Sequence, residues 1–116
     1  MKTTTKTNSP VLITDLEAAI MSLESDLEKS INAQPLFKTL GMQIMLIALD
    51  AKAELVRHTA PGPISVQVIK GSISFRTDET VHDLAIGGLL TLEGKIPHSV
   101  YGNERSIFLV TKSIPE

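Results

Sequence analysis

Two hydrophobic periodicities divide the chain near Pro35. Before it, Thr14 and Glu17 have the spacing of a capping box, in which each side chain bonds a free backbone N–H at a helix start. These residues predict a helix over about residues 14–30. The apolar stripe of this helix consists of Leu16, Ala19, Ile20, Leu23 and Leu27. We expect the stripe to pack against the rest of the domain or against a partner subunit.

After Pro35 the chain changes to short extended segments separated by turn residues. Residues 64–70 alternate, with Ile64, Val66 and Val68 on one face. The other predicted strands are residues 36–39, 42–49, 54–58, 72–76, 81–84, 89–92 and 106–112. Many short strands with regular turn signals are typical of an all-β sandwich or barrel. The pattern therefore predicts an antiparallel β-barrel or jelly roll preceded by one helix.

The segment Met42–Leu49 differs from the others because it is apolar on both faces apart from Gln43. An antiparallel strand with one face in water would alternate between apolar and polar residues. We therefore expect the barrel interior to cover one face of this strand, and the helix or a second subunit to cover the other. On this basis we predict a homodimer.

Two histidines frame the barrel segments and are the main candidates for chemistry. Strand parity places His58 on the same face as Val56, opposite Leu55 and Arg57, and His98 follows a proline. We expect the His58 and His98 imidazoles to face each other inside the barrel. Each imidazole could be hydrogen-bonded in a polar cavity, line a small-molecule pocket, or bind a divalent transition metal such as Zn, Fe, Ni or Mn.

The number of ligands weighs against a complete metal centre. Catalytic metal sites usually use three protein ligands, and we find no carboxylate at an inward position to join the two histidines. Gln43 or Gln67 could add only a weak amide oxygen. The remaining candidates for the lining of a ligand pocket are Gln43, Met45, Phe75, Tyr101 and Phe108. His82 is expected at the surface.

Composition limits the partners and the location of the protein. The 116 residues suffice for one domain, predicted as a flexible tail over residues 1–12 and a barrel domain over residues 13–116. A net charge of -2 and only 3% aromatic residues argue against binding to nucleic acid or to an anionic membrane. There are no cysteines, and neither a signal peptide nor a membrane-spanning stretch is visible. We therefore expect a cytoplasmic protein.

The spacing of these residues resembles that of the small single-domain cupins. The first motif of that family has two histidines, a glutamate and a glycine. His58 matches the first histidine and Gly71 matches the glycine, whereas Ala60 and Ile64 stand where the second histidine and the glutamate would be.

The second motif of the cupins begins with a glycine, usually followed by aspartate, and ends with a histidine. Gly87 and His98 match these ends, but Gly88 replaces the aspartate. The internal Pro-x-Gly of the motif is altered to Glu93-Gly94-Lys95. The resemblance covers roughly residues 36–112 and implies a cupin-type barrel, in which dimers are usual.

The resemblance also bears on function. Two of the four positions that bind metal in cupins are Ala60 and Ile64 here, and neither side chain can coordinate a metal. Because cupins include dioxygenases, isomerases, epimerases, storage proteins and binding domains, the fold does not select an activity.

Our first hypothesis is a protein that binds a small molecule between His58 and His98 without a complete metal centre. The alternatives are a metal-dependent dioxygenase or isomerase that uses both histidines as ligands, and a metal-free epimerase or isomerase. The last would require a carboxylate hydrogen-bonded to one imidazole.

Overall fold

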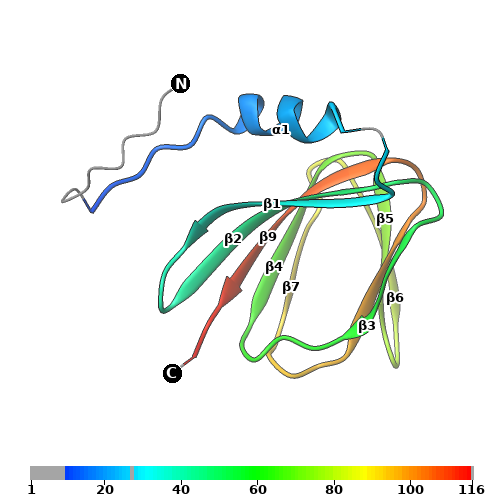
Figure 1. Ribbon diagram of the computed structural model, residues 1–116. Coiled ribbons are helices and arrows are strands. Elements are labelled where there is room, and N and C mark those ends of the chain that lie inside the picture. Colours follow the sequence, from blue (N-terminus) through cyan, green and yellow to red (C-terminus); the bar gives the residue numbers. More distant parts are fainter. Residues whose placement is uncertain (1–9, 27, 116) are drawn as a thin grey trace.

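Two antiparallel sheets face each other in the computed structural model of the chain, which describes residues 10–26 and 28–115 (Figure 1). Over these residues, one sheet has five strands in the order β1-β2-β9-β4-β7, and the other has four in the order β3-β8-β5-β6. The strands are β1 (Ile31–Lys38), β2 (Met42–Leu49), β3 (Glu54–His58), β4 (Ile64–Lys70), β5 (Ser72–Thr77), β6 (Val81–Ala85), β7 (Leu89–Leu92), β8 (His98–Gly102) and β9 (Ser106–Ser113). The predicted all-β fold with one N-terminal helix is confirmed.

The helix α1 (Leu16–Glu24) is shorter than predicted and begins with a different cap. The Asp15 side chain, not that of Thr14, accepts a hydrogen bond from the backbone N–H of Ala18 at 3.1 Å. The predicted capping box is therefore wrong, because Asp15 already satisfies a free N–H of the first turn. The stripe residue Leu27 lies outside the described residues. The predicted tail falls largely on residues 1–9, which are also outside them.

The first strand, β1, is longer than predicted because pairing with β2 overrides the local pattern. Ile31 pairs with Leu49, and the pairing continues to Lys38 with a register shift between Pro35 and Phe37. A proline lacks the backbone donor that a central strand needs, but an edge strand tolerates it. As the edge of the five-stranded sheet, β1 can therefore include Pro35.

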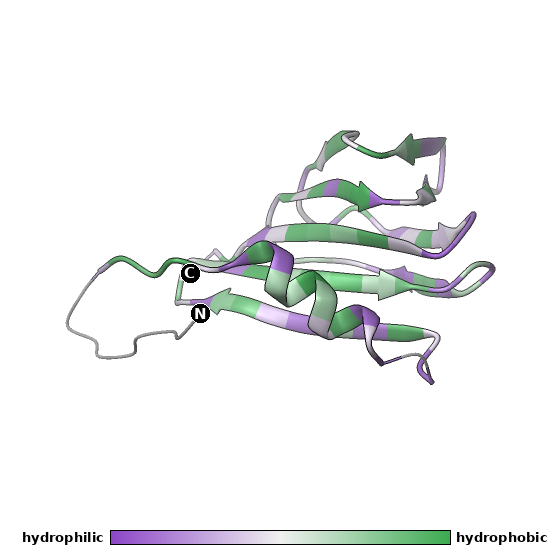
Figure 2. Cartoon of the chain, turned by 90° about the horizontal axis from the view of Figure 1, so that it is seen from above, coloured by the Kyte–Doolittle hydropathy of each residue, from purple (hydrophilic) through white to green (hydrophobic). Residues whose placement is uncertain are grey.

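The second half of β2, from Leu46 to Leu49, is buried on both faces in two separate apolar layers, as predicted, whereas Met42 at its start is 40% exposed. Ile47 and Leu49 face the core between the sheets, together with residues such as Val66, Phe75 and Phe108. Leu46 and Ala48 face the other way and pack under the three buried stripe residues of α1. Figure 2 shows the helix lying across the five-stranded sheet, in front of long apolar stretches of its strands. Because α1 covers Leu46 and Ala48, a second subunit is not needed to bury this half of the strand. The homodimer stays a prediction.

The predicted parity of β3 is wrong. Val56 is 72% exposed, whereas Leu55 packs against the core between the sheets. The register with β8 shifts between Leu55 and His58, so that an irregularity in β3 places both of these residues toward the interior. A bulge of this kind changes which residues share a face. His58 therefore faces inward, but with Leu55 and not with Val56.

The two loops at one end of the barrel contact each other through glycines. A Cβ atom on Gly94 would lie 2.7 Å from the Cα atom of Gly62, closer than real side chains allow. The backbone N–H of Lys95 also donates to the carbonyl of Ala60 at 2.8 Å. The segment before β4 and the segment before β8 are thus joined backbone to backbone. Of the described residues, no helix is long and apolar enough to cross a membrane.

Candidate functional site

The two predicted histidines meet at the end of the β3–β8 pair. His58 and His98 are register partners, and their ring centroids lie 4.3 Å apart with the rings inclined at 62°. The His98 ring also stacks on Phe75, with centroids 5.2 Å apart and an interplanar angle of 14°. Phe75 and His98 are both buried, at 1% and 4% exposure, whereas His58 is exposed at the rim.

Backbone carbonyl groups determine which nitrogen of each imidazole carries the proton. Nδ1 of His58 lies 2.7 Å from the carbonyl oxygen of Val56, and Nδ1 of His98 lies 2.9 Å from that of Ile96. A carbonyl oxygen only accepts, so Nδ1 is the donor in both rings. When neutral, each ring therefore presents an unprotonated Nε2 that can accept a hydrogen bond or coordinate a metal.

The environment of His98 favours this neutral form. Burial lowers the pKa of His98 below its usual value, and the positive charges of His58 and Lys112 lower it further. The hydrogen bond to the Ile96 carbonyl opposes these effects without cancelling them. At neutral pH, His98 therefore holds an available lone pair inside the barrel.

The cavity beside the two rings is small and mainly apolar; we call it the imidazole cavity. Its volume is about 60 Å³. It is lined by Ile47, Leu55, His58, Ala60, Ile64, Val66, Phe75, His98, Val100, Phe108, Val110 and Lys112. A cavity of roughly 150 Å³ holds a benzene-sized ligand, so this one holds only a few atoms of a bound molecule.

The sequence reasoning missed Lys112 as part of this cavity. The signal was present in β9, where Phe108, Val110 and Lys112 alternate and share one face. The strand predicted over residues 106–112 ends at this lysine, and a charged residue at a strand end is usually exposed. Its ammonium group adds a positive charge to a cavity that already contains two imidazoles.

The structure brings only part of the predicted pocket together. Phe75 and Phe108 line the imidazole cavity with the two histidines. Gln43 and Met45 are half-buried on β2 but do not line it, and Met45 packs against the core between the sheets. Tyr101 alternates with the buried residues of β8, and the Arg76 guanidinium lies 5.3 Å from its ring centroid.

These residues do not fit a complete metal centre. Over residues 10–26 and 28–115, no three His, Cys, Asp or Glu side chains form a group that could hold a metal ion. Ala60 and Ile64 are buried in the cavity wall and have no donor atoms. Lys112 would also place a cation beside a bound metal cation, which is unfavourable.

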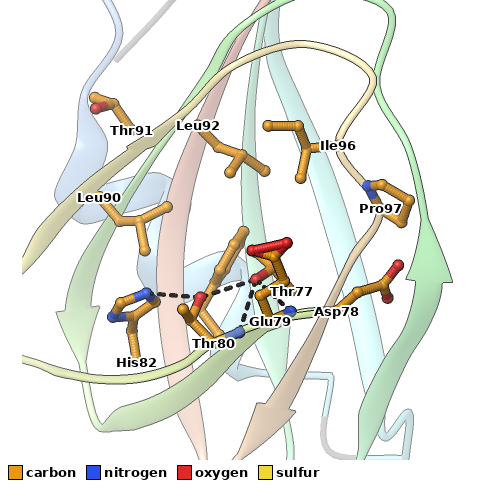
Figure 3. A pocket seen from close by; sticks show the side chains of 11 residues that line it. Thr77, Asp78, Glu79, Thr80, His82, Leu90, Thr91, Leu92, Ile96 and Pro97 are labelled. Carbon is orange, nitrogen blue, oxygen red and sulfur yellow. Dashed lines mark hydrogen bonds between the residues drawn. The ribbon is translucent and has the colours of Figure 1, made fainter.

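A larger cleft, which no sequence pattern predicts, shares Phe75 with the imidazole cavity. Figure 3 shows the side chains that line this cleft. This cleft, which we call the hairpin cleft, has a volume of about 490 Å³. It is lined by Phe75, Thr77, Asp78, Glu79, Thr80, His82, Leu90, Thr91, Leu92, Ile96 and Pro97. His82, predicted as a surface residue, is indeed exposed, but it forms part of the cleft. The cleft joins elements that are distant in sequence, which explains why no local motif reveals it.

Comparison with known proteins finds matches to the fold of this chain but not to its sequence. No protein-family profile matches the sequence, and no curated protein matches it. The fold, in contrast, is similar to many solved structures.

Three examples show the range of these structural relatives. A cupin superfamily protein from Desulfitobacterium hafniense has a TM-score of 0.73 at 18% identity, covering 76% of this chain and 81% of that chain. A conserved protein of unknown function from Streptococcus pyogenes has a TM-score of 0.72 at 25% identity, covering 77% and 78%. A salicylate 1,2-dioxygenase variant from Pseudoaminobacter salicylatoxidans has a TM-score of 0.76 at 13% identity, covering 86% of this chain but 34% of the dioxygenase.

The two facing antiparallel sheets define an all-β barrel of the jelly-roll type. More particularly, the structural relatives show that the chain has the cupin fold, as its motif spacing indicated. The names of these relatives include a dioxygenase and a protein of unknown function. The likeness therefore establishes the fold, and the activity has to be argued from the site.

Proposed function

We propose that this chain is a small-molecule-binding protein of the cupin fold that uses His58 and His98 as hydrogen-bonding groups. The observation that carries the proposal is the composition of the imidazole cavity. Two imidazoles share it with Lys112, while Ala60 and Ile64 supply only apolar surface. Such a cavity attracts a polar or negatively charged group of a ligand more strongly than a divalent cation.

The volume of the imidazole cavity defines how a ligand would use it. About 60 Å³ admits a group such as a hydroxyl or a carboxylate, but not a whole drug-sized molecule. A carboxylate would pair with the Lys112 ammonium, and a hydroxyl would donate to the free Nε2 of His98. The rest of the ligand would extend past the exposed ring of His58.

A metal-dependent enzyme is the second candidate, favoured by the orientation of the two rings. Both Nδ1 atoms donate to backbone carbonyls, which is a common arrangement for histidines that bind a metal through Nε2. Two such ligands with water could hold a metal weakly. A metal-free enzyme with histidine as the base has less support, because backbone carbonyls occupy both Nδ1 atoms where the hypothesis requires a carboxylate.

Metal analysis of protein purified without a chelator or a histidine tag separates the two candidates. We expect less than stoichiometric metal in the wild type and no further change in His58→Ala or His98→Ala. His82→Ala is the control, because His82 lies outside the imidazole cavity. Stoichiometric metal that is lost in His58→Ala and His98→Ala but kept in the control would overturn the proposal in favour of the enzyme.

A further inference from the structure

The hairpin cleft is separated from the imidazole cavity by one side chain. Phe75 lines both spaces, and its ring is 1% exposed and stacked on His98. The cleft has a volume of about 490 Å³, and the imidazole cavity has about 60 Å³. Pockets for small ligands have volumes of about 300–1,000 Å³, so the cleft alone is large enough to bind one.

One wall of the hairpin cleft is apolar and the opposite wall is polar. Leu90, Leu92 and Ile96 point from β7 and the following loop toward the hairpin between β5 and β6 (Figure 3). Ile96 is 37% exposed, so part of its apolar surface is in contact with water. A bound apolar group would remove this surface from water, and that removal favours binding.

The polar wall is held in place by its own hydrogen bonds. Oγ1 of Thr77 accepts from the backbone N–H groups of Glu79 at 3.3 Å and Thr80 at 3.1 Å. The Thr80 hydroxyl lies 2.8 Å from Thr77 Oγ1 and 3.0 Å from Nε2 of His82. Because the hairpin is fixed before a ligand arrives, less conformational entropy is lost on binding.

The charge of the hairpin cleft is opposite in sign to that of the imidazole cavity. Both oxygens of Asp78 accept hydrogen bonds from Arg57, at 3.0 and 2.8 Å, so the charge of Asp78 is balanced. The Glu79 carboxylate has no cationic partner among the residues that the structure describes, and the lining contains neither lysine nor arginine. A positively charged group in the cleft would therefore gain a partner, whereas an anion would be repelled.

We infer that the hairpin cleft binds a small molecule with an apolar body and a protonated amine. The apolar body lies against Leu90, Leu92 and Ile96, and the ammonium group pairs with Glu79. The site is distinct from the imidazole cavity, and the inference does not depend on what that cavity holds.

Three probes of similar size test the chemistry: 2-phenylethylamine, 2-phenylethanol and 3-phenylpropionate. Titration of ¹⁵N-labelled protein at low salt locates each probe by the amide shifts it causes. We expect the amine to shift residues 77–82 and 89–92 with a millimolar Kd. The carboxylate should bind about fivefold more weakly, as expected for a partly exposed charge pair, and the alcohol should fall between them.

Single-residue variants distinguish binding at the hairpin cleft from nonspecific binding to the protein surface. Glu79→Gln should bring the Kd of the amine close to that of the alcohol, while Glu93→Gln should not, because Glu93 is an exposed carboxylate outside the lining. Leu92→Asp should weaken binding of the uncharged alcohol.

Four results would overturn the inference: equal affinity for amine and carboxylate, an amine preference that survives Glu79→Gln, shifts centred outside the cleft, or no binding of any probe at about 10 mM. Loss of amine binding in His58→Ala without loss in Glu79→Gln would place the probe in the imidazole cavity instead. None of these binding results would change the metal content, which tests the proposed function separately.

Discussion

The two spaces on either side of Phe75 differ in both size and charge. The imidazole cavity measures about 60 Å³ and contains Lys112 and two imidazoles, whereas the hairpin cleft measures about 490 Å³ and contains an unbalanced carboxylate. Both are formed by the same sheets. The difference shows that, within one barrel, the side chains at strand ends and hairpins determine which ligand chemistry each space accepts.

The wall between these spaces also contributes to stability, and this gives the largest predicted effect. Phe75→Ala should lower the free energy of unfolding by about 3–5 kcal/mol, the usual cost of removing a buried phenylalanine. Urea unfolding measures this loss. The variant should also join the two spaces and admit the amine probe more deeply, so that the shifts extend to His98.

Phe108→Ala is the matched control, because Phe108 is equally buried but lines only the imidazole cavity. It should cost a similar free energy without changing how the probe binds in the cleft. Identical probe binding in both variants would contradict the role of Phe75 as the wall.

Restoring donors to the imidazole cavity should produce a metal site. In the variant with Ala60→His, Ile64→Glu and Lys112→Met, the first two changes introduce the groups that the cupin motif has at these positions, and the third removes the cation. We expect stoichiometric binding of Ni or Zn, measured by metal analysis and isothermal titration calorimetry. Because Ala60 is buried, the volume added by Ala60→His should cost about 1–3 kcal/mol of stability.

Lys112→Met alone is the reference for this variant, since it removes the cation without adding ligands. A redesigned cavity that folds but stays free of metal would show that backbone placement, and not residue identity, prevents binding.

The lowered pKa of His98 predicts a smaller effect that depends on pH. In the unfolded chain His98 binds a proton near its usual pKa, whereas the folded protein binds it only at lower pH. The stabilisation is therefore complete above the unfolded pKa of about 6.5 and is lost as pH falls toward the folded value. Urea unfolding at pH 8 and pH 5 should show lower stability at pH 5.

His98→Gln should reduce this pH dependence, whereas His82→Gln, at an exposed position, should leave it intact. An unchanged slope in His98→Gln would assign the effect to another group.

The smallest predicted effect concerns the exposed ion pair at the rim of the hairpin cleft. Arg57→Gln releases the Asp78 carboxylate and should bind the amine probe slightly more tightly, with little change in stability. The gain should disappear at about 1 M salt, where the screening length is only about 3 Å. Weaker amine binding in this variant would mean that Asp78 does not contribute to the field in the cleft.

The sequence predicted the elements of the barrel better than the details of the site. The apolar pattern of β2 correctly predicted burial on both faces of its second half, because periodicity reports burial directly, but Met42 at its start is exposed. Parity failed for Leu55 and Val56, since the register shift between Leu55 and His58 depends on pairing with β8. Pairing with β2 likewise extended β1 through Pro35, where local propensity argues against a strand.

Motif spacing identified His58 and His98, but not what surrounds them. Lys112 could have been found by extending the alternation of Phe108 and Val110 by one step. The hairpin cleft could not, because Glu79 and Leu92 come from segments without a shared local pattern. Cavities formed by distant segments require the tertiary structure.

The glycine contact between the loops before β4 and β8 has a consequence for how this barrel can diversify. A Cβ atom on Gly94 would meet the Gly62 backbone, and one on Gly62 would meet the carbonyl oxygen of Ser113 at the end of β9. Neither glycine can therefore gain a side chain without moving a neighbouring backbone, so the loops must change together or remain as they are. The hairpin between β5 and β6 is exposed and closes a sheet edge, and so it can accept insertions at little cost. New ligand specificities should therefore arise by lengthening that hairpin, while the loops before β4 and β8 keep their conformation.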